Sequence, residues 1–173
     1  MRQTRKQLKR QALILTGRLP TKKMSMNKSK SGGGRRRNIE SKTSKAALTI
    51  VPTFLHMLNT VKLYHWKTMS FSTHKATDEL YGSLNEKLDK FVEVMLGKKE
   101  LGGRSKLLNV SMIKLSMYSN NEAFTKQIES YKSFLLALSN DAVFGDLMNT
   151  DLLAIRDEIL ADFNQFLYLL SLK

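Results

Sequence analysis

After Pro52 the chain contains no proline, and its apolar residues recur at intervals of three and four positions. Proline interrupts a helix because it lacks a backbone N–H and clashes with the preceding turn. Residues three and four positions apart lie on one face of a helix, whereas alternation at every second residue marks a strand. No segment shows that alternation, so the sequence predicts an all-α fold.

Four segments carry the helical pattern. In the first of them, Leu48, Val51 and Leu55 begin one apolar face. A longer middle connection contains two adjacent glycines, and within it the stretch LLNVSMIKLS (107–116) predicts a short extra helix. Long amphipathic helices bury their apolar faces most readily against one another. We therefore expect a four-helix bundle over residues 44–173, with long helices at 44–67, 73–97, 120–139 and 148–172.

The positive charge of the chain lies in its first 45 residues. They hold 15 of the 29 lysines and arginines and one acid, which accounts for the net charge of +14, and the rest of the chain is neutral. Such a segment buries too little apolar surface to fold alone, so we predict a basic N-terminal arm, residues 1–43, that is disordered until bound. A polybasic arm is typical of binding to nucleic acid through its phosphates. The predicted contacts are Arg2, Arg5, Lys6, Lys9, Arg10, Arg18, Lys22, Lys23, Lys28, Lys30, Arg35, Arg36 and Arg37.

Other partners suit the same arm. An arginine-rich, acid-poor N-terminus is also typical of an organelle transit peptide. The arm could equally dock on an acidic protein of a large assembly or on a membrane surface. No run of about 20 apolar residues occurs, so no membrane span is predicted. The chain has no cysteine, which excludes disulfides and thiolate metal sites.

Four polar residues share one stripe of the second expected helix. His74 and Asp78 are four positions apart, as are Asp89 and Glu93, and the second pair begins 11 residues after Asp78. At about 100° per residue, intervals of four and eleven return to nearly the same face of a helix. Acidic pairs on a helix are often only a solvated face. Imidazole with carboxylates is also ligand chemistry for iron, manganese or zinc.

The two pairs lie about 16 Å apart along the helix, so they cannot hold one ion within a single chain. If two copies of the helix cross antiparallel about a two-fold axis, His74 and Asp78 of one copy face Asp89 and Glu93 of the other. Such a homodimer forms two identical sites. His65, at the end of the first expected helix, can reach the same site because the turn between the helices is short. Two imidazoles and three carboxylates suit iron.

These residues resemble the ferroxidase motif of Dps-type mini-ferritins, the DNA-protection proteins of the ferritin-like superfamily. The shared pattern is HW, an aromatic residue, H-x-x-x-D, an acid eleven residues later and another four after that. The resemblance implies a ferritin-like bundle in which His65, His74 and Asp78 bind iron with the partner copy's Asp89 and Glu93, beside Trp66. It also implies oxidation of Fe(II) by peroxide or dioxygen, a twelve-subunit shell, and a location in the cytoplasm or nucleoid.

One segment departs from the family pattern. The turn KTMSFST between the two histidines is about three residues shorter than the family's, and it lacks the usual glycine. Shortened variants of this kind loosely resemble proteins of large DNA viruses. The alternative function is therefore a structural one, in which the bundle is part of a virion or capsid. Its arm would thread through that assembly, and the metal site would not turn over.

Overall fold

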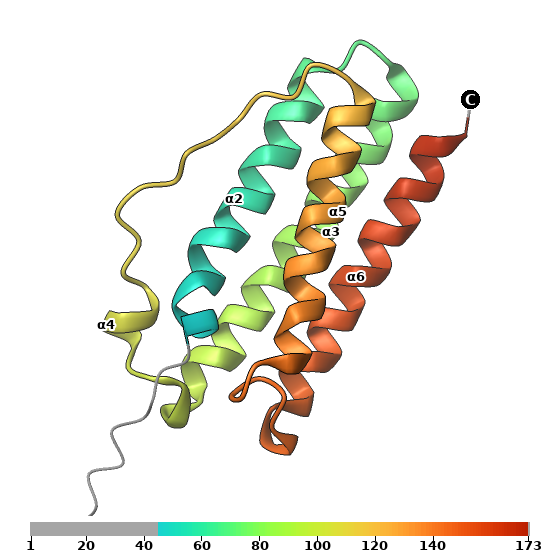
Figure 1. The fold of residues 1–173 in the computed structure, drawn as a ribbon. Coiled ribbons are helices and arrows are strands. Elements are labelled where there is room, and N and C mark those ends of the chain that lie inside the picture. Colours follow the sequence, from blue (N-terminus) through green and yellow to red (C-terminus); the bar gives the residue numbers. More distant parts are fainter. Residues whose placement is uncertain (1–44, 173) are drawn as a thin grey trace, which may run out of the picture. The chain divides into compact units, whose positions relative to one another are not determined.

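The computed structural model describes residues 45–172, and over this range it contains helices and connections but no strand. The prediction of an all-α fold is confirmed. Each predicted long helix is present, with bounds that shift by at most three residues. The four long helices are α2 (Lys45–Lys67), α3 (Phe71–Gly97), α5 (Asn121–Ala137) and α6 (Thr150–Ser171) (Figure 1).

The predicted short helix in the middle connection is present, but its predicted position at 107–116 is wrong. The short helix α4 (Arg104–Leu107) ends where that stretch begins, and residues 109–119 form no helix. Asparagine, valine and serine in this stretch favour helix weakly, and most of its side chains are exposed. The segment runs back along the bundle to the start of α5 (Figure 1). Three single-turn 3-10 helices complete the described part: η1 (Lys99–Leu101), η2 (Leu138–Asn140) and η3 (Leu147–Asn149).

The four long helices share one apolar core. Aromatic side chains join helices across it: the ring centroids of Phe54 and Phe91 lie 5.1 Å apart, and those of Tyr64 and Phe124 lie 3.9 Å apart. Edge-to-face and offset-stacked pairs of this kind add to the stabilisation from burial. The fully buried positions include Ile50, Met57, Val61, Leu84, Met95, Ile128, Leu135, Ile159 and Phe163.

One predicted apolar face only partly enters this core. Val51 is buried, but Leu48 and Leu55 are 44% and 38% exposed. The core face of α2 instead centres on Ile50, Phe54 and other residues one position earlier in the chain. Helix α2 therefore has a second apolar stripe on its outer side, which is only partly covered by the described residues.

A three-residue turn joins α2 to α3. Thr68 N–H donates to Tyr64 O (3.0 Å), which extends the hydrogen bonding of α2 into the turn. Ser70 caps α3, because its hydroxyl accepts from Thr73 N–H (3.3 Å). The short turn holds the end of α2 directly beside the start of α3.

By length and mean hydropathy (1.2), α2 is the one described helix able to cross a membrane. A core helix has the same properties, and α2 supplies much of the core here. Residues 1–44 lie outside the described range. The predicted arm and its contacts with nucleic acid therefore stay predictions.

Candidate metal site

His65 and His74 face each other across the α2–α3 turn. Their rings stack with centroids 3.9 Å apart and planes 27° apart. Each Nδ1 lies 3.1 Å from the backbone carbonyl of the other histidine. Two reciprocal hydrogen bonds therefore hold both imidazoles in place. We define this pair, together with Asp78, as the histidine turn.

These contacts determine which ring nitrogens remain free. A carbonyl oxygen can only accept, so each Nδ1 carries the hydrogen and donates it. In a neutral imidazole, Nε2 then presents a lone pair. Metal-binding histidines usually show this arrangement, with the second nitrogen hydrogen-bonded to a carbonyl or carboxylate.

Asp78 lies beside one of the free nitrogens. Its Oδ1 is 3.8 Å from His65 Nε2, and its side chain is 57% exposed. Two donors at this separation can both bind one ion at about 2.1 Å, as in zinc sites. When the imidazole is neutral, Nε2 and the carboxylate both present lone pairs to a cation, and when it is protonated the two groups form an ion pair.

Thr77 also belongs to the site, although the sequence analysis missed it. Its hydroxyl lies 3.3 Å from His65 Nδ1 and donates to the carbonyl of Thr73 or His74. It therefore helps to orient the His65 ring. Thr77 is fully buried. Its position one residue before Asp78 was the only hint in the sequence that Thr77 belongs to the site. From sequence alone, a threonine on the buried face of a helix is interpreted as a core residue.

Asp89 and Glu93 are exposed further along α3, and nothing in the structure brings them to the histidine turn of the same chain. Within residues 45–172, no three histidine, aspartate or glutamate side chains lie close enough to hold one ion. The described part of a single copy therefore holds no such group. Completion by a second copy stays a prediction.

Trp66 follows His65 but is 68% exposed. Lys62 Nζ lies 4.5 Å from the ring centroid of Tyr81 and 5.7 Å from that of Trp66. The lysine and the two aromatic rings therefore form one surface cluster on the outer side of α2 and α3. Its suggested position beside a bound metal stays a prediction.

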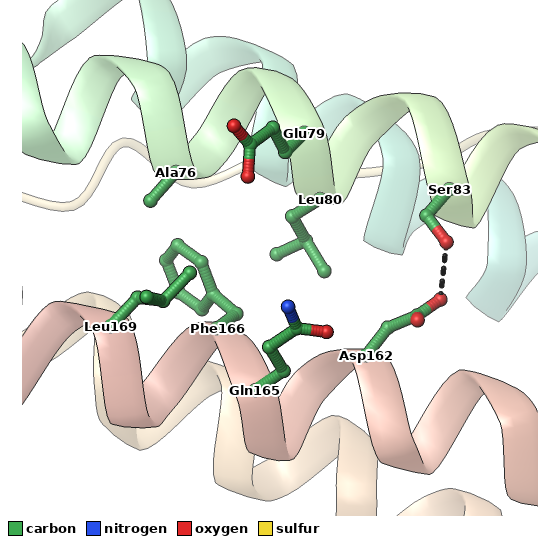
Figure 2. Close-up of a pocket in the computed structure, with 8 residues that line it drawn as sticks. All are labelled: Ala76, Glu79, Leu80, Ser83, Asp162, Gln165, Phe166 and Leu169. Atoms are coloured by element: carbon green, nitrogen blue, oxygen red, sulfur yellow. Dashed lines mark hydrogen bonds between the residues drawn. The ribbon is translucent and has the colours of Figure 1, made fainter.

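A second polar site lies between α3 and α6. Lys87 Nζ donates to both carboxylate oxygens of Asp162 (2.6 and 2.7 Å), and the hydroxyl of Ser83 donates to the same group (2.6 Å). We call these three residues the charge-paired site. Ser83 and Asp162 also line a small pocket of about 130 Å³, together with Glu79 and Gln165 (Figure 2). Because Lys87 already neutralises Asp162, this pocket is a poor metal site.

The third histidine, His56, has a different role. Its Nδ1 lies 2.7 Å from the hydroxyl of Tyr131, and the two rings meet edge to face. Burial raises the pKa of Tyr131 above its usual range. His56 therefore joins α2 to α5 by a hydrogen bond and a ring contact.

Residues 65–170 match a family described as a family of unknown function, DUF5856. The chain belongs to this family. The match begins at His65 and contains His74, Asp78, Asp89 and Glu93, so the DUF5856 region covers all five predicted ligands. No curated protein and no solved structure matches the chain.

Proposed function

We propose that this DUF5856 protein is a Dps-type mini-ferritin, which binds and oxidises iron at sites shared by two copies of the chain. The histidine turn carries the proposal. It holds two imidazoles, each of which donates a hydrogen bond from Nδ1–H to a backbone carbonyl, and a carboxylate oxygen 3.8 Å from His65 Nε2. The helices would adopt the ferritin-like arrangement, which agrees with their number and order.

The donor set fits iron as a substrate. His65, His74 and Asp78 of one copy, with Asp89 and Glu93 of its partner, would supply two nitrogens and three carboxylates. Carboxylates offset the charge of Fe(II), and imidazoles suit first-row metals including manganese and zinc. One peroxide would accept one electron from each of two Fe(II) ions and, with two protons, become two waters. Dioxygen is the other candidate oxidant.

The N-terminal arm extends the proposal to nucleic acid. The net charge of +14 is confined to residues 1–45, and the arm carries all of it except the charge of Lys45. Binding through phosphates would be independent of sequence and would weaken steeply with salt. Loss of affinity between about 50 and 200 mM salt, measured with full-length protein and with a variant lacking residues 1–43, tests this part alone.

The direct test of the iron site uses Asp78→Asn, with Glu79→Gln as its matched control. Both changes remove one exposed carboxylate from the same turn of α3, but only Asp78 lies beside His65. We expect Asp78→Asn to abolish Fe(II) oxidation while helix content is unchanged, and Glu79→Gln to keep it. Equal oxidation by both variants would refute the site.

The alternative is a structural role in a large assembly such as a virion. One observation favours it: the histidine pair fastens the α2–α3 turn through hydrogen bonds that need no metal. The discriminating measurements are the mass of the protein in solution and its metal content. A hollow twelve-subunit shell containing iron supports the mini-ferritin, whereas a metal-free monomer supports the structural role.

A further inference from the structure

The outer sides of α2 and α3 form an apolar groove, which we call the outer groove. Its floor is Phe54 and Leu88, its walls are Leu55, Leu58 and Val92, and Asp89 lies at its rim. The groove has a volume of about 240 Å³. A cavity of about 150 Å³ lined by apolar side chains binds benzene, so the outer groove is large enough for an indole ring.

Trp66 lies on the same side of α2 as Leu55, which is part of the outer groove. The two residues are 11 positions apart, and an interval of 11 returns to nearly the same face of a helix. Trp66 is the only tryptophan of the chain, and 68% of it is exposed. The 11 residues between Leu55 and Trp66 span about 16 Å of helix. Trp66 therefore cannot reach the outer groove of its own chain.

The same interval separates Asp78 from Asp89 on α3. Since α2 and α3 run antiparallel, Trp66 lies near the level of Asp78, and Leu55 lies near the level of Asp89. His65, one residue before Trp66, confirms this level through its contact with Asp78. A two-fold rotation that sets Asp78 against Asp89 of a second copy therefore also sets Trp66 against the Leu55 wall of that copy.

We propose that Trp66 of one copy fills the outer groove of a second copy, and that the second copy returns the same contact. This inference rests on the proposed function, in which two copies of the chain pair about a two-fold axis. It adds the residues that hold the two copies together. Lys62 beside Trp66 is basic and Asp89 at the groove rim is acidic, so the two surfaces are complementary in charge. Buried tryptophans at the centre of an interface commonly dominate its affinity.

Fluorescence of the single tryptophan tests the contact directly, in full-length protein kept free of metal by a chelator. We expect a concentration-dependent blue shift of emission, in step with the change from monomer to dimer mass. Leu55→Asp, which alters only the groove, should abolish that shift and weaken dimerisation at least about 30-fold, the cost of losing one hot-spot residue. Leu136→Asp, at an exposed leucine of α5, is the matched control and should dimerise normally.

Mixing two variants checks that the contact is between copies. Trp66→Ala retains the groove and Leu55→Asp retains the tryptophan, so each alone should dimerise only weakly. Their mixture should form heterodimers with one intact contact and blue-shifted emission. Circular dichroism of each variant establishes that it is folded.

The outcomes separate this inference from the proposed function. Dimers in which Trp66 emission stays that of an exposed indole would overturn the inference, and so would normal dimerisation of Leu55→Asp, whether or not iron is oxidised. A blue shift that depends on Leu55 in protein that binds no iron would support the inference and refute the mini-ferritin function.

Discussion

The histidine turn and the charge-paired site both include polar residues of α3, but they differ in which polar atoms are held by hydrogen bonds within the chain. At the charge-paired site, both carboxylate oxygens of Asp162 accept from Lys87, and Ser83 adds a third hydrogen bond. At the histidine turn, the hydrogen bonds use each Nδ1 and leave Nε2 and the Asp78 carboxylate facing each other. The charge-paired site is therefore closed by its own hydrogen bonds, whereas the histidine turn leaves one ring nitrogen and an exposed carboxylate available to a ligand.

The largest expected effect on stability comes from breaking the charge-paired site. Asp162→Ala leaves Lys87, whose side chain is only 24% exposed, without its partner. Removing one member of a poorly exposed ion pair is strongly destabilising, and we expect the free energy of unfolding to fall by about 2–3 kcal/mol. Chemical denaturation measures this. Glu158→Ala, at an exposed acid of the same helix, should change it by less than about 0.5 kcal/mol, and similar losses in the two variants would contradict the comparison.

An intermediate effect is expected from His65→Ala. The substitution removes a buried ring and its hydrogen bonds to His74 O and Thr77, which should lower the free energy of unfolding by about 1–2 kcal/mol. Iron binding, followed by titration, should be lost as well. A folded variant with unchanged iron binding would show that His65 serves the turn alone.

A smaller effect isolates the orientation of the His65 ring. Thr77→Val keeps the shape of the buried side chain but removes the hydroxyl beside His65 Nδ1. Loss of one hydrogen bond costs about 1 kcal/mol, and loss of such a supporting contact weakens metal binding by at least about 10-fold. Thr77→Ser restores the hydroxyl and should restore iron affinity. If serine and valine behave alike, the hydroxyl plays no part.

The smallest effect concerns a third ion pair, Lys98 with Asp151 (2.9 Å), in which the Asp151 side chain is 53% exposed. The hydrogen bond from Lys98 lowers the pKa of Asp151 below its usual value of 3.8. A lowered folded-state pKa stabilises the fold above the unfolded value, and this contribution is lost as the pH falls below about 4. Asp151→Asn should therefore flatten the acid side of the stability curve slightly. An unchanged curve would show that the pair contributes nothing.

Much of the fold followed from apolar spacing alone. The interval of three and four residues located all four long helices, because each helix must bury one face. The same pattern failed at residues 107–116, where Leu107 is buried but the following side chains have little to pack against. The pattern also could not distinguish the core side of α2 from its outer side. Leu48 and Leu55 are spaced as on one helical face, but that face points outward.

The site was predictable to the extent that helix geometry determines it. Spacing placed His74 and Asp78 on one face, and the short turn brought His65 to them. The reciprocal hydrogen bonds between the two histidines could not be predicted, because they depend on the backbone of a three-residue turn. The role of Thr77 could not be predicted for the same reason, because its contact with His65 Nδ1 depends on the orientation of the His65 ring.

The central claim is that each metal site takes ligands from two copies, and mixed variants test it most directly. Asp78→Asn and Glu93→Gln should each bind no iron, because each breaks both sites of a dimer. When the two variants are unfolded and refolded together, half of the dimers are mixed, and each of these retains one intact site. We predict recovery of about a quarter of the wild-type iron binding and oxidation. No recovery in refolded mixed dimers would contradict the account, because it would place the site within a single chain or nowhere.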